Sequence, residues 1–255
     1  MAKIKLSGVT LRYPIYTPST RAIKTALFTR LGGTISEQRN TVVVEALRDF
    51  DLELADGDRL GIIGHNGAGK TTLLRVLAQV YEPQMGTVEI DGTVSSFVDI
   101  TLGMDPEASG WDNIVFRGTF LGLTYERARE LAPSIADFSE LGDYLRMPVR
   151  TYSSGMFMRL AFAITTSVQP QIIVMDEMIG AGDAGFLDKA IARITGMLDQ
   201  TKIVVVATHS NFIIRRFCNK VLWLEKGTIK ALGPIDSVLD DYDKATQGGG
   251  LQLTT

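Results

Sequence analysis

The sequence of 255 residues holds one cysteine, Cys218, and two histidines, His65 and His209. A single cysteine excludes an intrachain disulfide and a cysteine-cluster metal site. No run approaches the roughly 18 consecutive apolar residues of a membrane-spanning helix, and the start, MAKIKLSGVT, lacks the apolar core of a signal peptide. These absences predict a cytoplasmic chain that depends on another protein for any passage through a membrane.

The formal net charge is −3, so the molecule as a whole does not attract nucleic acid, and we expect no nucleic-acid partner. A hydrophobic content of 45% and a charged content of 22% are ordinary for a globular protein. The length suits one large domain with a lobe inserted in it.

Short apolar runs alternate with helical patterns over much of the chain. The runs RLGIIG, PQIIVMDE and KIVVVATHS predict a mainly parallel core sheet that is buried on both faces. Alternating polarity in residues 3–12 and 42–59 predicts an antiparallel layer beside it. Between the runs RLGIIG and PQIIVMDE, the stretch from Trp111 to about Leu145 has a helical pattern with expected interruptions at Gly122 and Pro133. The fold class is therefore α/β, with an antiparallel β-subdomain and an inserted helical subdomain.

GHNGAGKT, residues 64–71, fits the phosphate-binding pattern G-x-x-x-x-G-K-[ST] between a predicted strand and a predicted helix. Its glycines allow several backbone N–H groups to point at a phosphate, and the helix dipole favours the negative charge. Lys70 is expected to reach the β- and γ-phosphates, and the Thr71 hydroxyl to bind Mg²⁺. The predicted ATP-binding residues of this loop are Gly64, Asn66, Gly67, Ala68, Gly69, Lys70, Thr71 and Thr72. The pattern identifies a P-loop NTPase.

The apolar strand IIVMDE delivers two acids to its carboxyl end, where open parallel sheets bind ligands. Asp176 is expected to hold Mg²⁺ through water, and Glu177 to act as the catalytic base on an attacking water. The alternative is a solvated pair of acids that ends a strand. His209 follows KIVVVATHS at the same sheet end, where it contacts the γ-phosphate or the water, or else serves the core or a helix cap. We interpret His65 as incidental.

The stretch YSSGMFMRLAFA, residues 152–163, places small residues where a helix starts. A serine there either caps the helix through a backbone N–H or forms part of a phosphate-binding helix N-terminus.

Taken in order, these motifs resemble the nucleotide-binding subunit of ABC transporters, over residues 1–245. The resemblance implies a helical subdomain over about 105–160 that carries the signature motif, ATP and Mg²⁺ as cofactors, and a homodimer. Beyond it, the Gly-rich composition predicts a flexible tail over 246–255. It places Ser153, Ser154 and Gly155 at the signature, which binds the ATP of the other subunit. Asp183 matches the D-loop aspartate, and His209 the switch histidine. Tyr13, or else Tyr16, matches the aromatic residue that stacks on adenine.

Three features depart from the family's pattern. Ser154 replaces the first glycine of the signature and Met156 its final glutamine. The loop FVDITLGMDPEASGWDN lacks the usual glutamine, so Asp99 or Thr101 is the nearest substitute and Asp99 is a candidate metal ligand. An insertion over 14–41 interrupts the N-terminal strand pair.

The insertion has two interpretations. It is either a surface excursion that joins two strands, or an amphipathic helix whose basic face contacts a membrane subunit or anionic headgroups. The apolar positions are Ile23, Leu27, Phe28 and Leu31, and the basic ones Arg21, Lys24 and Arg30.

The motifs YSSGM, LGMDPEASGWDNI and GAGDAGF are similar to those of the ABC branch that exports bacterial polysaccharides and teichoic acids. The resemblance implies an ATPase that powers export of a lipid-linked polysaccharide (O-antigen, capsule, galactan or teichoic acid) through a separate polytopic permease. It implies a location on the cytoplasmic face of the bacterial inner membrane. Only a short tail follows the ATPase, so we expect no polysaccharide-binding domain in this chain.

Other functions remain possible from the sequence. The subunit could serve export of another substrate, or the chain could be a soluble ABC ATPase that acts on nucleic acid or ribosomes, although it shows no coiled coil or basic linker. A P-loop kinase or GTPase is disfavoured by the ordered set Ser153, Asp176, Glu177, Asp183 and His209.

Overall fold

The computed structural model describes residues 1–16, 35–38, 41–176 and 184–247. They form two compact units. The first unit comprises 1–92, 174–177 and 202–255, and the second comprises 93–173 and 178–201. The expected helical subdomain over about 105–160 lies within the second unit, which is longer at both ends.

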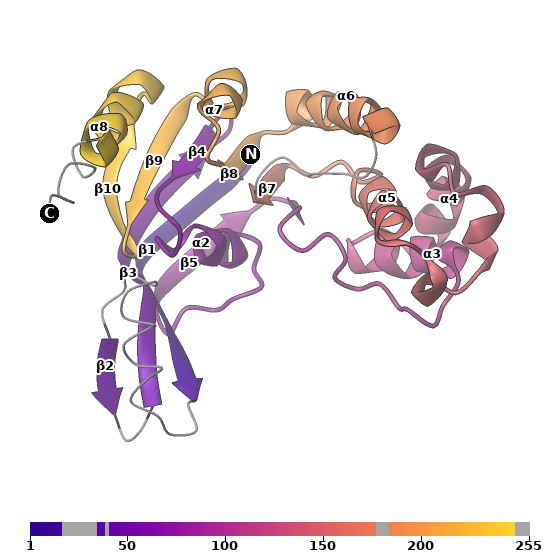
Figure 1. Cartoon of the computed structure of the whole chain (residues 1–255), viewed down its shortest axis with the longest axis horizontal. Helices are drawn as coiled ribbons and strands as arrows, with labels where there is room; N and C mark the ends of the chain where they lie inside the picture. Colours follow the sequence, from indigo (N-terminus) through magenta and orange to yellow (C-terminus); the bar gives the residue numbers. More distant parts are fainter. Residues whose placement is uncertain (17–34, 39–40, 177–183, 248–255) are drawn as a thin grey trace, which may run out of the picture. The chain divides into compact units, whose positions relative to one another are not determined.

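The first unit opens with an antiparallel sheet in the strand order β2-β3-β1-β5 (Figure 1). Its strands are β1 (Lys3–Tyr16), β2 (Ile35–Gln38), β3 (Thr41–Ala55) and β5 (Met85–Asp91). Successive side chains of a strand point to opposite faces of the sheet, so Ile4 and Leu6 are buried in the core whereas Lys3 is exposed to water. The expected antiparallel layer is confirmed.

Strands β1 and β3 pair from Lys3↔Ala55 to Tyr16↔Thr41. The segment expected as an insertion over 14–41 therefore begins and ends inside paired strands, and β2 pairs with β3 within it. The helix expected in its middle, with its basic face, lies outside the described residues.

A second sheet contributes strands to the first unit in the order β10-β9-β4-β8-β7. The strands are β4 (Arg59–Ile63), β7 (Ile172–Asp176, whose last residues belong to this unit), β8 (Ile203–Ala207), β9 (Lys220–Glu225) and β10 (Thr228–Gly233). Strand β4 is parallel to both β8 and β9, and all of β8 is buried. The mainly parallel core sheet is confirmed.

Helices cover this sheet. Helix α2 (Lys70–Leu77) contacts β3 of one sheet and β8 of the other through a buried face that includes Leu73 and Leu77. Helix α7 (Asn211–Phe217) follows β8, and α8 (Ile235–Gln247) packs on β9. One apolar cluster joins Ile63 of β4 to Trp223 of β9 and Leu239 of α8. The C-terminal helix therefore rests on the strand that precedes the phosphate loop.

The second unit is mainly helical. Next to β6 (Val94–Ser96), the N–H groups of Gln171 and Ile172 donate to the Thr93 carbonyl. The helices are α3 (Gly110–Phe120), α4 (Tyr125–Ser139), α5 (Ser154–Thr165) and α6 (Ala184–Gln200), with short 3₁₀ turns η1 (Gly142–Arg146) and η2 (Val149–Thr151). Helices α3, α4 and α5 pack on one another. Phe138, Phe162 and Phe186 form an aromatic core at centroid distances of 5.6–6.1 Å.

The predicted interruption at Gly122 is confirmed, because α3 ends before it and α4 begins after it. The one at Pro133 is wrong, because Pro133 lies inside α4. Proline removes one helical hydrogen bond and crowds the carbonyl four residues earlier. Pro133 is exposed, so water can bond that carbonyl and the helix continues.

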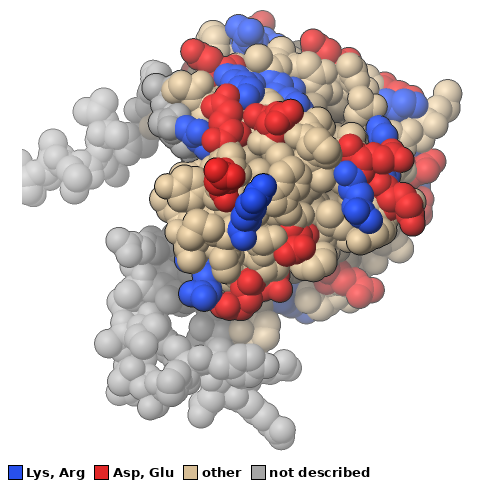
Figure 2. Space-filling model, turned by 90° about the vertical axis from the view of Figure 1, so that its right-hand side faces the viewer, with Lys and Arg blue, Asp and Glu red and all other residues tan. Residues whose placement is uncertain are grey.

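Among the described residues, no helix has the length and apolarity to cross a membrane. On the face that Figure 2 shows, Lys and Arg side chains lie interspersed with Asp and Glu, with uncharged surface between them. This face offers no continuous basic stripe of the kind that tracks nucleic acid.

Candidate functional site

The loop between β4 and α2 is shaped by glycines with left-handed backbone. Gly64 has φ +148°, and a Cβ there would lie 2.3 Å from the Leu224 carbonyl oxygen. Gly69 has φ +109° and caps α2, and a Cβ there would lie 2.7 Å from the Ala46 carbonyl oxygen. Only glycine adopts these angles at so close an approach of backbone. The loop therefore curls because of the glycines that the motif requires.

Two backbone hydrogen bonds link this loop to the antiparallel sheet through the β9–β10 turn. The Gly227 N–H, in the turn between β9 and β10, donates to the Ala68 carbonyl at 2.9 Å. The Gly227 carbonyl accepts from the Arg48 N–H of β3 at 3.0 Å. The β9–β10 turn is thus hydrogen-bonded to the phosphate loop on one side and to the antiparallel sheet on the other.

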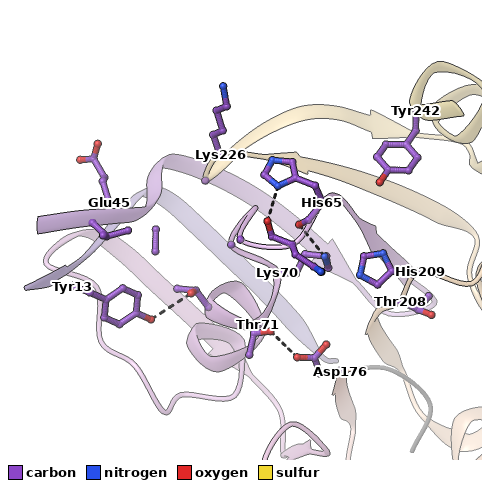
Figure 3. Close-up of a pocket in the computed structure, with 17 residues that line it drawn as sticks. Tyr13, Glu45, His65, Lys70, Thr71, Asp176, Thr208, His209, Lys226 and Tyr242 are labelled. Carbon is purple, nitrogen blue, oxygen red and sulfur yellow. Dashed lines mark hydrogen bonds between the residues drawn. The ribbon is translucent and has the colours of Figure 1, made fainter. Parts of the chain in front are cut away.

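A cavity of about 920 Å³ opens over the loop, entirely within the first unit (Figure 3). Nine residues expected at the site line it, and they come from β1, the loop, α2, β7 and the end of β8. They are Tyr13, Asn66, Gly67, Gly69, Lys70, Thr71, Thr72, Asp176 and His209. Gly64 and Ala68 belong to the same loop but are buried beneath its surface.

Polar contacts in the cavity join the loop to β7. Lys70 Nζ donates to the carbonyl oxygens of Gly64 at 2.6 Å and His65 at 3.2 Å. Thr71 Oγ1 donates to Asp176 Oδ2 at 2.7 Å. A hydroxyl beside a carboxylate is the kind of oxygen set that Mg²⁺ takes in nucleotide sites, where phosphate oxygens and water complete the shell. The residues present therefore fit a magnesium–nucleotide complex.

Tyr13 and His209 stand on different walls of the cavity. The Tyr13 hydroxyl donates to Thr72 Oγ1 at 3.4 Å, and its ring meets Tyr81 edge-on with centroids 5.7 Å apart. Burial raises the pKa of Tyr13, so the phenol stays protonated. Tyr16 ends β1, and its side chain lies outside the description. His209 directly follows Thr208 at the end of β8 and is exposed to the cavity.

The cavity wall includes residues that the motifs did not indicate, among them Glu45, Lys226 and Tyr242. His65, which we interpreted as incidental, also lines it, with Nδ1 2.7 Å from the Asn66 carbonyl oxygen. Glu45, Lys226 and Tyr242 could not be assigned from spacing, because strand register and the packing of α8 bring them to the loop, whereas His65 lies within the loop motif itself.

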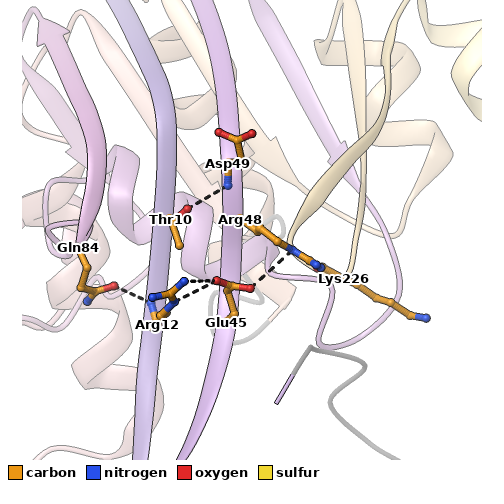
Figure 4. Close-up of polar contacts among 7 residues, drawn as sticks. All are labelled: Thr10, Arg12, Glu45, Arg48, Asp49, Gln84 and Lys226. Carbon is orange, nitrogen blue, oxygen red and sulfur yellow. Dashed lines mark hydrogen bonds and ion pairs between the residues drawn. The ribbon is translucent and has the colours of Figure 1, made fainter. Parts of the chain in front are cut away.

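Glu45 belongs to a charged cluster that crosses β1 and β3 (Figure 4). Arg12 lies directly opposite Glu45, and its Nε and Nη2 donate to Glu45 Oε1 at 3.0 and 2.9 Å. Arg48 Nε lies 3.7 Å from Glu45 Oε2, and Arg48 Nη2 donates to the Lys226 carbonyl at 3.4 Å. The cluster ties the cavity rim on β3 to the β9–β10 turn.

In the second unit, Ser153 caps α5, since its Oγ accepts from the Met156 N–H at 3.2 Å. Ser153 and Ser154 are exposed. A Cβ on Gly155 would meet only Ser153 Oγ, at 3.9 Å, among the residues that the structure describes. Nothing described in the chain itself requires glycine there. The Tyr152 hydroxyl donates to the Tyr144 carbonyl at 2.8 Å and so anchors the start of the helix.

Three other candidates are not brought to the cavity by the described structure. Asp99 is exposed in the second unit, and it is absent from the described cavity wall. Glu177 and Asp183 lie outside the described residues.

The chain is similar to known proteins over nearly its whole length. The family model for ABC transporters matches residues 47–180. The O-antigen export system ATP-binding protein RfbE of Yersinia enterocolitica is 43% identical over 90% of this chain and 97% of its own length. The teichoic acids export ATP-binding protein TagH of Bacillus anthracis is 35% identical over 95% of this chain, which spans 42% of that protein.

Solved structures show the same fold. The ATP-binding cassette MJ0796, as a dimer in a post-hydrolysis state with ADP and Pi, superposes with a TM-score of 0.66 at 20% identity. That match covers 91% of this chain and 98% of the other. With the phosphate loop, the Thr71–Asp176 contact and His209 around one cavity of this fold, the chain belongs to the ABC transporter family, as one of its ATP-binding cassettes.

Proposed function

We propose that this chain is the ATP-binding subunit of an exporter, and that it hydrolyses ATP as a homodimer to drive a lipid-linked polysaccharide through a separate membrane permease. The hydrogen bond between Thr71 and Asp176 inside the loop cavity carries the ATPase assignment. The 43% identity to RfbE, over 97% of that protein's length, supports the O-antigen class of cargo.

Within one chain, the first unit binds the nucleotide. Tyr13 stacks on adenine at one end of the cavity, and the backbone N–H groups of residues 64–72 surround the phosphates. Lys70 exchanges its contacts with the loop carbonyls for the β- and γ-phosphates, to which a compact ammonium is well suited. Thr71 and Asp176 would hold Mg²⁺, the latter through water. When bound, the ion supplies Lewis-acid stabilisation of charge on the transferred phosphoryl group.

Hydrolysis requires a base beside the γ-phosphate. Glu177 follows Asp176 directly and is the residue that accepts a proton from the attacking water. His209 lines the cavity from the neighbouring strand end and orients the γ-phosphate and the water. Asp99 lies in the loop where the family carries glutamine, and there it senses the metal.

Ser153, Ser154 and Gly155 act on the ATP of the partner subunit, with Asp183 at the dimer interface. The open space at Gly155 supports this role, because a glycine without an intrachain reason leaves room for a ligand from outside. The cap that Ser153 makes is compatible with it, since one hydroxyl can accept from the helix and donate to a phosphate.

The permease partner needs a surface on this chain. In the second unit, Leu102, Phe116 and Phe120 are all about half exposed or more. A Cβ on Gly103 would lie 3.0 Å from the Phe120 ring, so the loop packs beside that side chain. Exposed apolar groups of this kind mark interaction sites. Docking there places the subunit peripherally on the cytoplasmic face of the inner membrane.

Deleting the gene tests the function as a whole. We expect lipid-linked polymer to accumulate inside the cell and to disappear from the surface. Wild-type chain should restore it, and Glu177→Gln should not. Normal surface polysaccharide in the deletion strain would contradict the assignment of a polysaccharide cargo. Restoration by Glu177→Gln would contradict ATP hydrolysis as the driving force of export.

A further inference from the structure

Tyr242 lines the nucleotide cavity although it lies in α8, near the C-terminal end of the described chain. Its ring meets Trp223 of β9 edge-on, with centroids 5.4 Å apart. The parallel register of β4 and β9 pairs Trp223 with Ile63, the last residue before the phosphate loop. The packing on Trp223 therefore sets Tyr242 level with the start of that loop.

The loop is thus flanked on both sides. Strand β4 lies between β8 and β9. His209 reaches the cavity from the end of β8, and Tyr242 reaches it over β9. In Figure 3 the Tyr242 hydroxyl points toward the space between His65 and His209, on the side of the loop away from Tyr13. In the proposed complex, with adenine at Tyr13, the phosphate chain ends on this side of the cavity.

The chemistry of Tyr242 suits a phosphate oxygen. The described structure contains no hydrogen bond from its hydroxyl to another described residue, so the group is available to a ligand. Burial, and then the nearby Asp243 carboxylate, raise the pKa of Tyr242. The phenol therefore remains a hydrogen-bond donor at neutral pH.

We propose that the Tyr242 hydroxyl donates a hydrogen bond to the terminal phosphate of bound ATP, as a positioning residue that distinguishes ATP from ADP. The inference rests on the proposed nucleotide site. It also connects α8 to the nucleotide state, because the ring that carries this hydroxyl packs against the apolar cluster joining α8 to β4 and β9.

The test compares Tyr242→Phe with the wild-type chain in titrations of the non-hydrolysable ATP analogue AMP-PNP and of ADP, each with Mg²⁺. The substitution keeps the ring on Trp223, so the melting temperature should not change. AMP-PNP should bind about tenfold more weakly, as expected for one lost hydrogen bond to a charged group, whereas ADP affinity should stay within about twofold.

Tyr125→Phe is the matched control, because it removes an exposed phenol hydroxyl from α4 in the other unit, and both affinities should stay at the wild-type value. Equal weakening of AMP-PNP and ADP in Tyr242→Phe, or no weakening of either, overturns the inference. A wild-type chain that binds neither nucleotide would instead overturn the proposed site itself, which keeps the two failures distinguishable.

Discussion

Thr71 Oγ1 donates a hydrogen bond of 2.7 Å to Asp176 Oδ2, across 105 residues of sequence. Thr71 lies in the first turn of α2 and Asp176 ends β7, and both line the same cavity. In the proposed complex both side chains would hold Mg²⁺. The contact therefore holds the Asp176 carboxylate beside the first turn of α2.

Thr71→Val removes this hydroxyl with little change of shape. Since Thr71 is a direct Mg²⁺ ligand in the proposal, we expect Mg²⁺ to lose most of its effect on AMP-PNP affinity. Titrations with and without Mg²⁺ measure this, and Thr71→Ser, which keeps the hydroxyl, should behave as wild type. An undiminished Mg²⁺ effect in Thr71→Val would remove Thr71 from the metal site.

Glu177→Gln keeps the size and hydrogen bonding of the side chain but cannot accept a proton. The ATPase rate should fall about 10²- to 10⁴-fold, the usual cost of a lost general base. ATP binding should persist, so the variant should accumulate as an ATP-bound dimer in size-exclusion chromatography. Near-normal turnover would assign the base to another residue.

Gly155→Ala tests whether the signature works across a dimer. A Cβ there meets only Ser153 Oγ, at 3.9 Å, among the described residues, so the melting temperature should be unchanged while the ATPase rate falls.

Mixing Ser153→Arg chains with Glu177→Gln chains should restore activity, because a hybrid dimer contains one composite site without either substitution. Activity equal to the mean of the two parents would argue against composite sites.

Gly64→Ala should collapse the phosphate loop. Its Cβ would lie 2.3 Å from the Leu224 carbonyl, so β4 and β9 must separate or the loop must move, and nucleotide binding should be lost with a lowered melting temperature. Gly57→Ala is the control: its φ is also positive, at +91°, but its Cβ has no described atom within 4 Å. It should cost only about 1 kcal/mol of backbone strain. Equal effects in calorimetry would show that the angle alone, rather than the close approach, demands glycine.

Arg117→Met should raise the stability of the protein. Arg117 is 1% exposed, and its Nε and Nη1 have no hydrogen-bond partner among the described residues. Burial lowers its pKa to about 10, which shows the cost of keeping the charge there. Its Nη2 donates to Thr165 Oγ1, but that hydroxyl also donates to the Ala161 carbonyl, so the substitution orphans no buried group.

We expect Arg117→Met to gain about 1 to 4 kcal/mol, as when buried ionic groups are replaced by apolar ones of similar size. The free energy of unfolding in urea measures this. A loss of stability would indicate that a group outside the described structure, such as a buried water, balances the guanidinium.

Local sequence was enough for features whose physical cause is local. The glycines of residues 64–69 impose the curl of the phosphate loop through their own backbone angles, and continuous apolar runs such as Ile203–Ala207 indicate a strand buried on both faces. The order of the motifs, from Lys70 to His209, was sufficient to recognise the family. Pro133 shows the limit of this approach, because its effect on α4 depends on which face of the helix meets water.

The tertiary structure alone decided which residues outside the motifs share the cavity. Glu45 reaches its rim through the register of β3 against β1, and Tyr242 through the packing of α8 on Trp223 of β9. Strand register and helix docking depend on how complete apolar faces fit together, and no short stretch of sequence contains that information. The identity of the phosphate-binding loop is therefore a property of eight consecutive residues, whereas the wall around it belongs to the whole first unit.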